Sequence, residues 1–313
     1  MHRLGTLLAA LALVAAACGG DDGGAASTTT TSPPGSTTTT SQPATSTTTT
    51  STTVPPTTST TVPETDQFVK VYFLIDDVGG ESGPFVRPVI RQIEPTVEVA
   101  RAAITELIAG PSADERAGTP AISGGLPDGT RLLGLTIRDG VARVDLSEEI
   151  EDIGGTFGEM SVLAQLVFTL TQFPTVDNVV LLIEGAEVEF FGGHGMDVSP
   201  SMDRDYFLGG GLVPDILIDT PAWFATAESP LLVSGIARAF EATVEWALFD
   251  NDGLPLAEGF TMASTGGPDW GTFQFAIPYQ VDTPQLGSLM MWEESARDGS
   301  QMHLVEHPVR LGP

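Results

Sequence analysis

The chain has 313 residues and a formal net charge of −28, from 41 acidic and 13 basic side chains, with a single cysteine. Nucleic acids and anionic lipid surfaces are bound through basic patches, so this excess of acid argues against both as partners. One cysteine cannot form an internal disulfide, and it argues against a cysteine-rich zinc site. Lys70 is the only lysine, and all other basic residues are arginines. We attribute this imbalance between lysine and arginine to codon usage.

The first residues are predicted to be an export signal. The apolar run from Leu4 to Ala17 is shorter than the roughly 20 residues that span a bilayer, which predicts a signal peptide over residues 1–17. Small residues precede Cys18, a pattern that resembles the lipobox of bacterial lipoproteins. The resemblance implies cleavage before Cys18 and lipidation of its sulfur. An ordinary secretory signal with an incidental cysteine is the alternative.

Residues 18–66 are predicted to be a lipidated N-terminus followed by a disordered linker. From Ser27 to Thr65 most residues are Thr, Ser or Pro. Such a segment has little apolar surface to bury, so nothing offsets the entropy lost on ordering it. We expect the linker to hold an acidic body away from the membrane, whose anionic lipids repel it at short range.

A first folded unit is predicted over residues 67–205. Strands are expected at Phe68–Ile75, Phe85–Ile93 and Val179–Glu184. A helix is expected between Thr96, which can cap its first turn, and Gly110, which ends it. The mixed order of strands and helices predicts an α+β domain, with two helices covering one face of a small sheet.

A β-hairpin is predicted around Asp139-Gly140, which has the composition of a two-residue turn. Such a turn places apolar residues opposite one another in three pairs, Ile137 with Ala142, Leu135 with Val144 and Leu133 with Leu146. All six side chains then lie on one side of the hairpin and specify its register.

The second helix is predicted to start at Thr156, because Thr156-Phe-Gly-Glu159 has the pattern of a capping box, and to end before Pro174. Its expected buried stripe consists of Met160, Leu163, Val167 and Leu170. Gln165, Thr169 and Gln172 lie off that stripe. Two interpretations of these three residues are open, namely ordinary exposure and a face for a partner.

Five stretches of this unit form a recognisable set. They are Leu107–Pro111, Pro127–Gly134, Val144–Ser147, Leu163–Val176 and Val179–Gly185. Together they resemble the GerMN domain of spore-germination and sporulation proteins. The resemblance implies a compact module like the ring-building modules of secretion systems, which assembles with other envelope proteins and catalyses no reaction. Gly193-His194-Gly195 stands where family members often carry an acidic residue, a departure of little consequence in a loop.

Residues 213–313 are predicted to form a second, all-β domain. Short runs of alternating apolar residues are separated by turns, and no helix-length pattern interrupts them, which predicts a β-sandwich. Four stretches, Leu232–Gly235, Phe240–Val244, Leu256–Thr261 and Glu294–Ser300, resemble the immunoglobulin-like domain of bacterial spore-germination proteins. That domain commonly follows GerMN, so the two resemblances support each other.

The most suggestive metal motif is His303-Leu-Val-Glu306-His307, which matches the H-x-x-E-H string of a zinc peptidase family. That chemistry needs a helix, so that both imidazoles project from one side, whereas this segment is predicted to be a strand. Four residues of strand span about 13 Å, too far for two zinc–nitrogen bonds of about 2 Å. We therefore predict no metal site and expect a solvent-facing histidine pair.

Three further motifs are weaker. Asp250-Asn-Asp-Gly253 hints at a calcium loop but lacks the full spacing, and turn formation explains it. Gly192–Gly195 is glycine-rich but no helix follows it, so phosphate binding is not expected. Four residues form an acidic cluster after the hairpin, namely Glu148, Glu149, Glu151 and Asp152. We interpret them as a solvent-exposed connecting segment, with weak contact to a cation or a basic partner as the alternative.

We predict no catalytic residue and no cofactor. Gly80-Glu-Ser-Gly83 lacks the G-x-S-x-G pattern, and no nucleophile motif accompanies the loop residue His194. A hydrolase would instead need a cleft that gathers His194 or His303 with carboxylates.

The sequence thus predicts a non-enzymatic lipoprotein, anchored through Cys18 at the extracytoplasmic face of the cell membrane and related to sporulation or germination by resemblance. Its expected partners are envelope proteins, bound through exposed sheet edges and loops, and no nucleic acid. A glycan- or solute-binding lipoprotein is the alternative, and it would have a deep, aromatic-rimmed pocket between the two domains.

Overall fold

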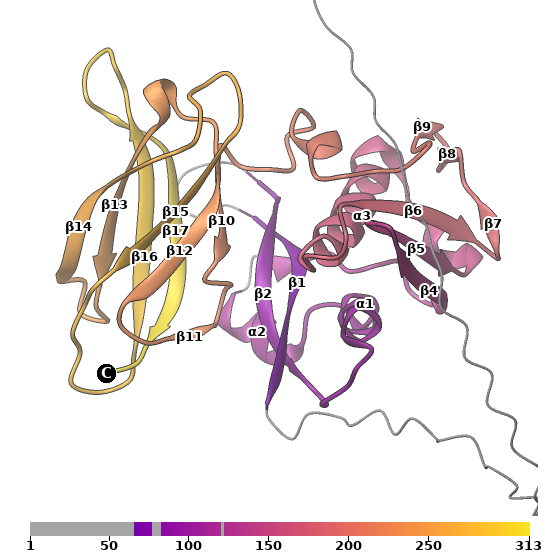
Figure 1. Ribbon diagram of the computed structural model, residues 1–313, viewed down its shortest axis with the longest axis horizontal. Coiled ribbons are helices and arrows are strands. Elements are labelled where there is room, and N and C mark those ends of the chain that lie inside the picture. Colours follow the sequence, from indigo (N-terminus) through magenta and orange to yellow (C-terminus); the bar gives the residue numbers. More distant parts are fainter. Residues whose placement is uncertain (1–65, 77–82, 120–121) are drawn as a thin grey trace, which may run out of the picture. The chain divides into compact units, whose positions relative to one another are not determined.

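The computed structural model describes residues 66–76, 83–119 and 122–313. The predicted signal peptide, Cys18 and the Thr/Ser/Pro-rich segment lie outside the described residues, as does most of Gly80–Gly83. The described chain contains the predicted α+β part followed by a β-sandwich (Figure 1). This confirms the predicted fold class.

The first part has its strands in two sheets. Its elements are β1 (Gln67–Ile75), β2 (Phe85–Ile93), α1 (Val99–Ala109), α2 (Ala113–Gly118), β3 (Ile122–Ser123), β4 (Leu132–Arg138), β5 (Val141–Leu146), α3 (Gly155–Leu170), β6 (Asn178–Ile183), β7 (Ala186–Glu187), β8 (Phe190–Phe191) and β9 (Met196–Asp197). One sheet has the order β2-β1-β3 and the other β4-β5-β6-β7, while β8 and β9 form a separate pair. Three short 3-10 helices occur in the described chain, at Glu148–Glu151, Asp205–Phe207 and Phe240–Ala242.

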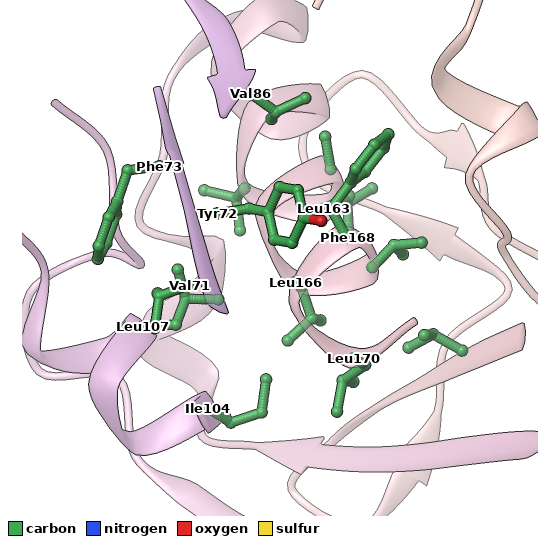
Figure 2. Packing of buried hydrophobic residues seen from close by; sticks show 14 of the residues in the cluster. Val71, Tyr72, Phe73, Val86, Ile104, Leu107, Leu163, Leu166, Phe168 and Leu170 are labelled. Atoms are coloured by element: carbon green, nitrogen blue, oxygen red, sulfur yellow. The ribbon is translucent and has the colours of Figure 1, made fainter. Parts of the chain in front are cut away.

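Helix α3 lies at the centre of the first part, where its apolar residues pack with those of both sheets (Figure 1). Every residue from Ser161 to Leu170 is buried. The predicted single buried stripe was therefore too narrow, because a helix between two sheets has no solvent-facing side. Figure 2 shows side chains of β1, α1 and α3, including Val71, Leu107 and Leu166, meeting in this core.

The three polar residues of this helix region also face inward. Strand β1 pairs with β2 on one side, but on its other side β3 covers only Leu74 and Ile75. Thr169 accepts a hydrogen bond from the backbone N–H of Tyr72 at 3.1 Å, and Gln172 accepts from that of Lys70 at 2.8 Å and donates to its carbonyl at 2.6 Å. Both interpretations made from sequence were wrong, because these side chains satisfy backbone groups that no strand pairs.

Gln165 has a similar role. It is buried and accepts a hydrogen bond from the backbone N–H of Gly125 at 2.7 Å. It therefore joins α3 to the loop that follows β3.

The hairpin of β4 and β5 follows the predicted register in part. Ile137 faces Ala142 and Leu135 faces Val144, as predicted. The pairing then shifts between Leu132 and Gly134, so that Leu132 and not Leu133 faces Leu146. A β-bulge adds one unpaired residue to a strand, and here it turns Leu133 outward, where it is 44% exposed.

The second part is a sandwich of a three-stranded and a five-stranded sheet. Its strands are β10 (Ile216–Thr220), β11 (Thr226–Ala227), β12 (Leu231–Ala237), β13 (Thr243–Phe249), β14 (Pro255–Met262), β15 (Gly271–Ile277), β16 (Gln285–Glu294) and β17 (Gln301–Leu311). The sheet orders are β10-β12-β15 and β11-β17-β16-β13-β14. Residues such as Val233, Val244, Leu289 and Val305 fill the space between them. Burying each such side chain contributes about 1.5–3 kcal/mol.

Candidate functional site

A polar hollow of about 510 Å³ lies between β1 and the end of α3 on one side and the three-stranded sheet on the other. Its lining residues are Lys70, Tyr72, Thr171, Gln172, Arg204, Asp219, Ser234, Gly235, Ile236, Thr272, Phe273 and Gln274. The two aromatic residues among them, Tyr72 and Phe273, are buried. The hollow lies where a solute-binding protein was expected to have its pocket, but its lining offers no exposed aromatic rim.

Arg204 is the centre of a hydrogen-bond network beside this hollow. Its guanidinium forms an ion pair with Asp219 and donates to the hydroxyl of Tyr72 at 3.0 Å, and that hydroxyl donates to Asp219 at 2.7 Å. Arg204 also donates to Thr171 at 2.9 Å and lies over the ring of Phe168 at 4.6 Å. Figure 2 shows Tyr72 next to Phe168, with ring centroids 5.4 Å apart.

The network fixes the protonation of its members. Burial, followed by the charge of Asp219, raises the pKa of Tyr72 well above its ordinary value of 10.0, so the phenol stays neutral and donates. Burial alone would lower the pKa of Arg204. Its interactions with Tyr72 and Asp219 outweigh burial and raise that pKa above its ordinary value. The negative charge of Asp219 is matched by the positive charge of Arg204.

Lys70 differs from Arg204 in having no anionic partner. Its ammonium donates to the Thr220 hydroxyl at 2.9 Å, and it forms no ion pair within the described part of the chain. Burial lowers the pKa of Lys70 from its ordinary 10.5, while the charge of Asp219 opposes that shift. The hollow is consequently lined by two cations and one carboxylate.

The outward side of the five-stranded sheet is a second candidate surface. We call it the outer sheet face and define it by Thr243, Glu245, Ala247, Phe249, Glu258, Phe260, Met262, Ser288, Met290, Trp292, Glu306 and Pro308. Cross-strand pairing aligns Phe260, Glu245 and Trp292 in one row and Glu258, Ala247, Met290 and Glu306 in the next. The strands of this sheet lie side by side in Figure 1.

This face is apolar and open to solvent. Phe260 is 64% exposed and Met262 is 58% exposed, while Met290 and Trp292 are half-buried. A hollow of about 450 Å³ opens beside them, with Phe249 in its lining. Large side chains exposed together on one sheet are typical of an interaction surface.

Carboxylates lie in the two central rows of the outer sheet face, and exposed Arg310 lies on the same side of the sheet, two residues beyond Pro308 and opposite Leu286. The ionisable residues of these two rows are Glu245, Glu258 and Glu306. Burial, with the charge of Glu294 as a second cause, raises the pKa of Glu245. A cationic group placed between these carboxylates would therefore be stabilised.

A third cluster surrounds His303. Its Nδ1 lies 2.9 Å from Asp215 and its Nε2 lies 3.9 Å from Glu293, and Arg238 also pairs with Asp215. These groups line a hollow of about 310 Å³. His303 has a left-handed φ of 52°, opposite a register shift between Met291 and Glu293 that re-aims side chains at this point.

The structure therefore gathers His303 with carboxylates, as a hydrolase would require. The hydrogen bond from His303 and then Arg238 outweigh burial and lower the pKa of Asp215. However, none of the residues lining this hollow is a serine, threonine or cysteine. The cluster can hold and exchange a proton, but its lining supplies no hydroxyl or thiol nucleophile.

The expectation of a solvent-facing histidine pair was wrong. The segment forms the predicted strand, but His307 is only 1% exposed and its ring packs against Trp223 with a centroid distance of 5.8 Å. Burial, together with the charge of Arg87, lowers the pKa of His307 to about 3. His307 is therefore a neutral core residue, and His303 belongs to a different cluster.

The glycine-rich loop around His194 encloses a carboxylate. His194 Nδ1 lies 3.0 Å from Glu159, which is buried on α3. This hydrogen bond lowers the pKa of Glu159. A side chain at Gly192, whose φ is 71°, would place its Cβ 2.3 Å from that carboxyl group. The predicted capping box is wrong because α3 starts at Gly155, without a side-chain cap, and Glu159 binds this loop instead.

The remaining motifs are local. Asp250 accepts hydrogen bonds from the backbone N–H groups of Asp252 and Leu254, at 2.9 and 2.8 Å. These bonds stabilise a turn, which explains the Asp250-Asn-Asp-Gly253 motif without calcium. In the acidic cluster, Glu151 and Asp152 are exposed, and Glu149 pairs with Arg131 at 3.0 Å.

Sequence reasoning missed Tyr72, Arg204 and Asp219, and it also missed Asp215 and Glu293 as partners of His303. Two residues noted in the sequence line the polar hollow, namely Lys70, the single lysine, and Gln172, one of the three polar residues beside the second predicted helix. No helix in the described ranges is long and apolar enough to cross a membrane.

Comparison with known proteins identifies both parts. Residues 70–189 match the Germane family model, described as sporulation and spore germination, and residues 215–300 match the Gmad2 model, described as the immunoglobulin-like domain of bacterial spore germination. No curated protein matches the chain.

Two solved structures are similar to parts of the chain. The tandem GerMN domains of the sporulation protein GerM from Bacillus subtilis are 16% identical with a TM-score of 0.39, and the match covers 68% of this chain and 62% of that structure. The first GerMN domain of the same protein is 21% identical with a TM-score of 0.38, covering 44% of this chain and 98% of that structure.

Proposed function

This chain combines a Germane domain of sporulation and spore germination with an immunoglobulin-like domain of bacterial spore germination, and from that premise we propose that it is a non-enzymatic docking protein of the cell envelope. Lipid on Cys18 tethers it at the extracytoplasmic face of the membrane. Its folded body binds another envelope protein, and the outer sheet face is the docking surface.

The observation that carries this proposal is the row in which Phe260 and Trp292 flank Glu245 on the outer sheet face. Exposed sheet edges and loops were the expected docking elements, and of these edges the open side of β1 is occupied by Thr169 of α3 and by Gln172. The outer sheet face instead exposes large side chains beside a hollow. Large apolar side chains exposed together on one sheet, with aromatic residues among them, support docking of a protein segment better than they support catalysis.

Charge selects the partner. Glu245, Glu258 and Glu306 lie in the two central rows of the outer sheet face, while Arg310 lies at its end, opposite Leu286. A second copy docked through the same face would bring these glutamates together, and like charges at an interface oppose binding. The occupant is therefore a segment of another protein that presents arginine or lysine among apolar side chains.

Site-specific photo-crosslinking in intact cells tests this proposal. A benzophenone amino acid at position 260 is expected to give one discrete adduct, whose crosslinked peptide is apolar and basic. Position 190 is the matched control, because Phe190 is also an exposed phenylalanine, at 61% against 64% for Phe260. The adduct should weaken when Glu245 and Glu306 are both replaced by glutamine. Equal adducts from positions 260 and 190, or an adduct unaffected by the glutamine replacements, would contradict the proposal.

A further inference from the structure

We propose that the polar hollow beside Lys70 binds a small, hydroxyl-bearing monocarboxylate. This is a ligand site separate from the outer sheet face, so it goes beyond the docking function. It belongs to the solute-binding class of activities, with a ligand chosen by charge and hydrogen bonding and not by aromatic stacking.

The hollow has two walls of different character. One wall is formed by β1 and the end of α3, where Lys70, Thr171 and Gln172 lie. The other wall is the outward side of the three-stranded sheet, where Ser234 and Gln274 are cross-strand neighbours. A volume of about 510 Å³ is within the range of about 300–1,000 Å³ that is usual for small-molecule sites.

The charge balance of the lining specifies a single negative charge. Arg204 is matched by Asp219, with both oxygens of that carboxylate engaged. The ammonium of Lys70 makes only its bond to the Thr220 hydroxyl. One unmatched cation favours a monoanion over a phosphate dianion, which would keep a second charge out of water without a partner.

The hydrogen-bonding groups specify the rest of the ligand. The Ser234 hydroxyl and the Gln274 amide face the hollow and make no hydrogen bond with any other described residue. Both groups donate and accept, as a ligand hydroxyl does. Thr272 adds a hydroxyl on the same wall, although this hydroxyl already donates to Ser264 at 3.3 Å. A polyhydroxy acid therefore matches the lining, whereas an apolar acid would leave these groups without partners.

If Lys70 served only to fill space, its ammonium group would have no evident role. Its burial lowers the pKa of the ammonium, which shows that the charged form is disfavoured where it stands. An aliphatic residue of the same length would fill the same space without that penalty. A bound carboxylate would stabilise the ammonium and raise the pKa of Lys70.

Because the full-length chain has one lysine, ¹³C-lysine labelling gives a single side-chain signal that reports on this site. D-gluconate and D-sorbitol are the matched probes, since they differ only in carboxylate against hydroxymethyl. We expect gluconate to shift the Lys70 ¹³Cε signal saturably and to raise its titration midpoint, with an affinity at least about tenfold above that of sorbitol. Sodium phosphate and sodium chloride at equal ionic strength should give no saturable shift.

Calorimetry with variants completes the test. Lys70→Met should weaken gluconate binding at least about tenfold, and Arg138→Met, which removes an exposed arginine elsewhere, should leave it unchanged. Ser234→Ala removes a donor from the opposite wall while the lysine signal still reports a folded site, and it should also weaken binding. Three results would each overturn the proposal: no gluconate shift, an equal response to sorbitol or chloride, or saturable binding of phosphate in place of gluconate.

Discussion

Replacing Asp219 by asparagine tests the network that holds β10 against β1 and α3. The carboxylate accepts from Tyr72 at 2.7 Å and pairs with Arg204, and the two charged side chains are only 22% and 21% exposed. Removing one partner of a fully buried ion pair costs about 3–5 kcal/mol, because the other charge is left without compensation. Partial exposure screens this pair, so we expect Asp219→Asn to lower the free energy of unfolding by about 2–3 kcal/mol.

Urea unfolding followed by tryptophan fluorescence measures this loss, and thermal unfolding should show a midpoint lower by about 4–12 °C. Asp269→Asn is the control, since Asp269 is exposed and has no hydrogen bond or ion pair in the described structure. A double-mutant cycle with Tyr72→Phe should give a coupling of about 1 kcal/mol or more, because the two residues share a hydrogen bond. A loss for Asp219→Asn no larger than that for Asp269→Asn would refute the reasoning.

Three further changes have defined outcomes. Gly192→Ala should lower the free energy of unfolding by about 1–3 kcal/mol more than Gly195→Ala, since both have a positive φ but only Gly192 lies against Glu159; equal losses in urea unfolding would contradict this. Burial is the main cause that lowers the pKa of His307 to about 3 in the folded chain. Below about pH 6.5 the unfolded chain therefore binds a proton at His307, whereas the folded chain keeps this residue neutral. The stability from His307 is complete above that pH and falls by up to about 1.4 kcal/mol per pH unit toward pH 3, and the slope measured by urea unfolding should be shallower in His307→Leu; an unchanged slope would exclude this role. Cys18→Ser should release the protein into the medium, and its retention in the membrane fraction would count against the lipid anchor.

Local patterns in the sequence predicted most of the fold. The turn at Asp139-Gly140 and the alternation around it gave the correct pairing of Leu135 with Val144, because both depend on neighbouring residues. The bulge before Leu135 was missed, since a bulge changes pairing without interrupting the apolar alternation. The extent of burial of α3 was underestimated for a different reason. Apolar periodicity identifies one buried stripe of a helix but does not reveal a second sheet that covers its other side.

The candidate sites depend on contacts between distant parts of the chain. Asp215 and His303 are far apart in sequence and meet only because β10 and β17 enter the same sandwich. Likewise, Lys70 reaches Thr220 across the two parts of the fold. No spacing rule connects such residues, so the single lysine was attributed to codon usage and its surroundings were not predicted. The outer sheet face was within reach, because Phe260 and Met262 alternate with inward-facing residues.

Once the crosslinked partner is known, its affinity for purified Phe260→Ser and Phe190→Ser chains is the most direct measurement of whether the outer sheet face is the docking surface. Truncating an aromatic side chain that anchors an interface typically costs more than about 1.4 kcal/mol, which is about tenfold in affinity. We therefore predict that Phe260→Ser raises the Kd at least about tenfold and that Phe190→Ser leaves it within about twofold of the unaltered chain. Equal affinities for the two variants would contradict docking through this face.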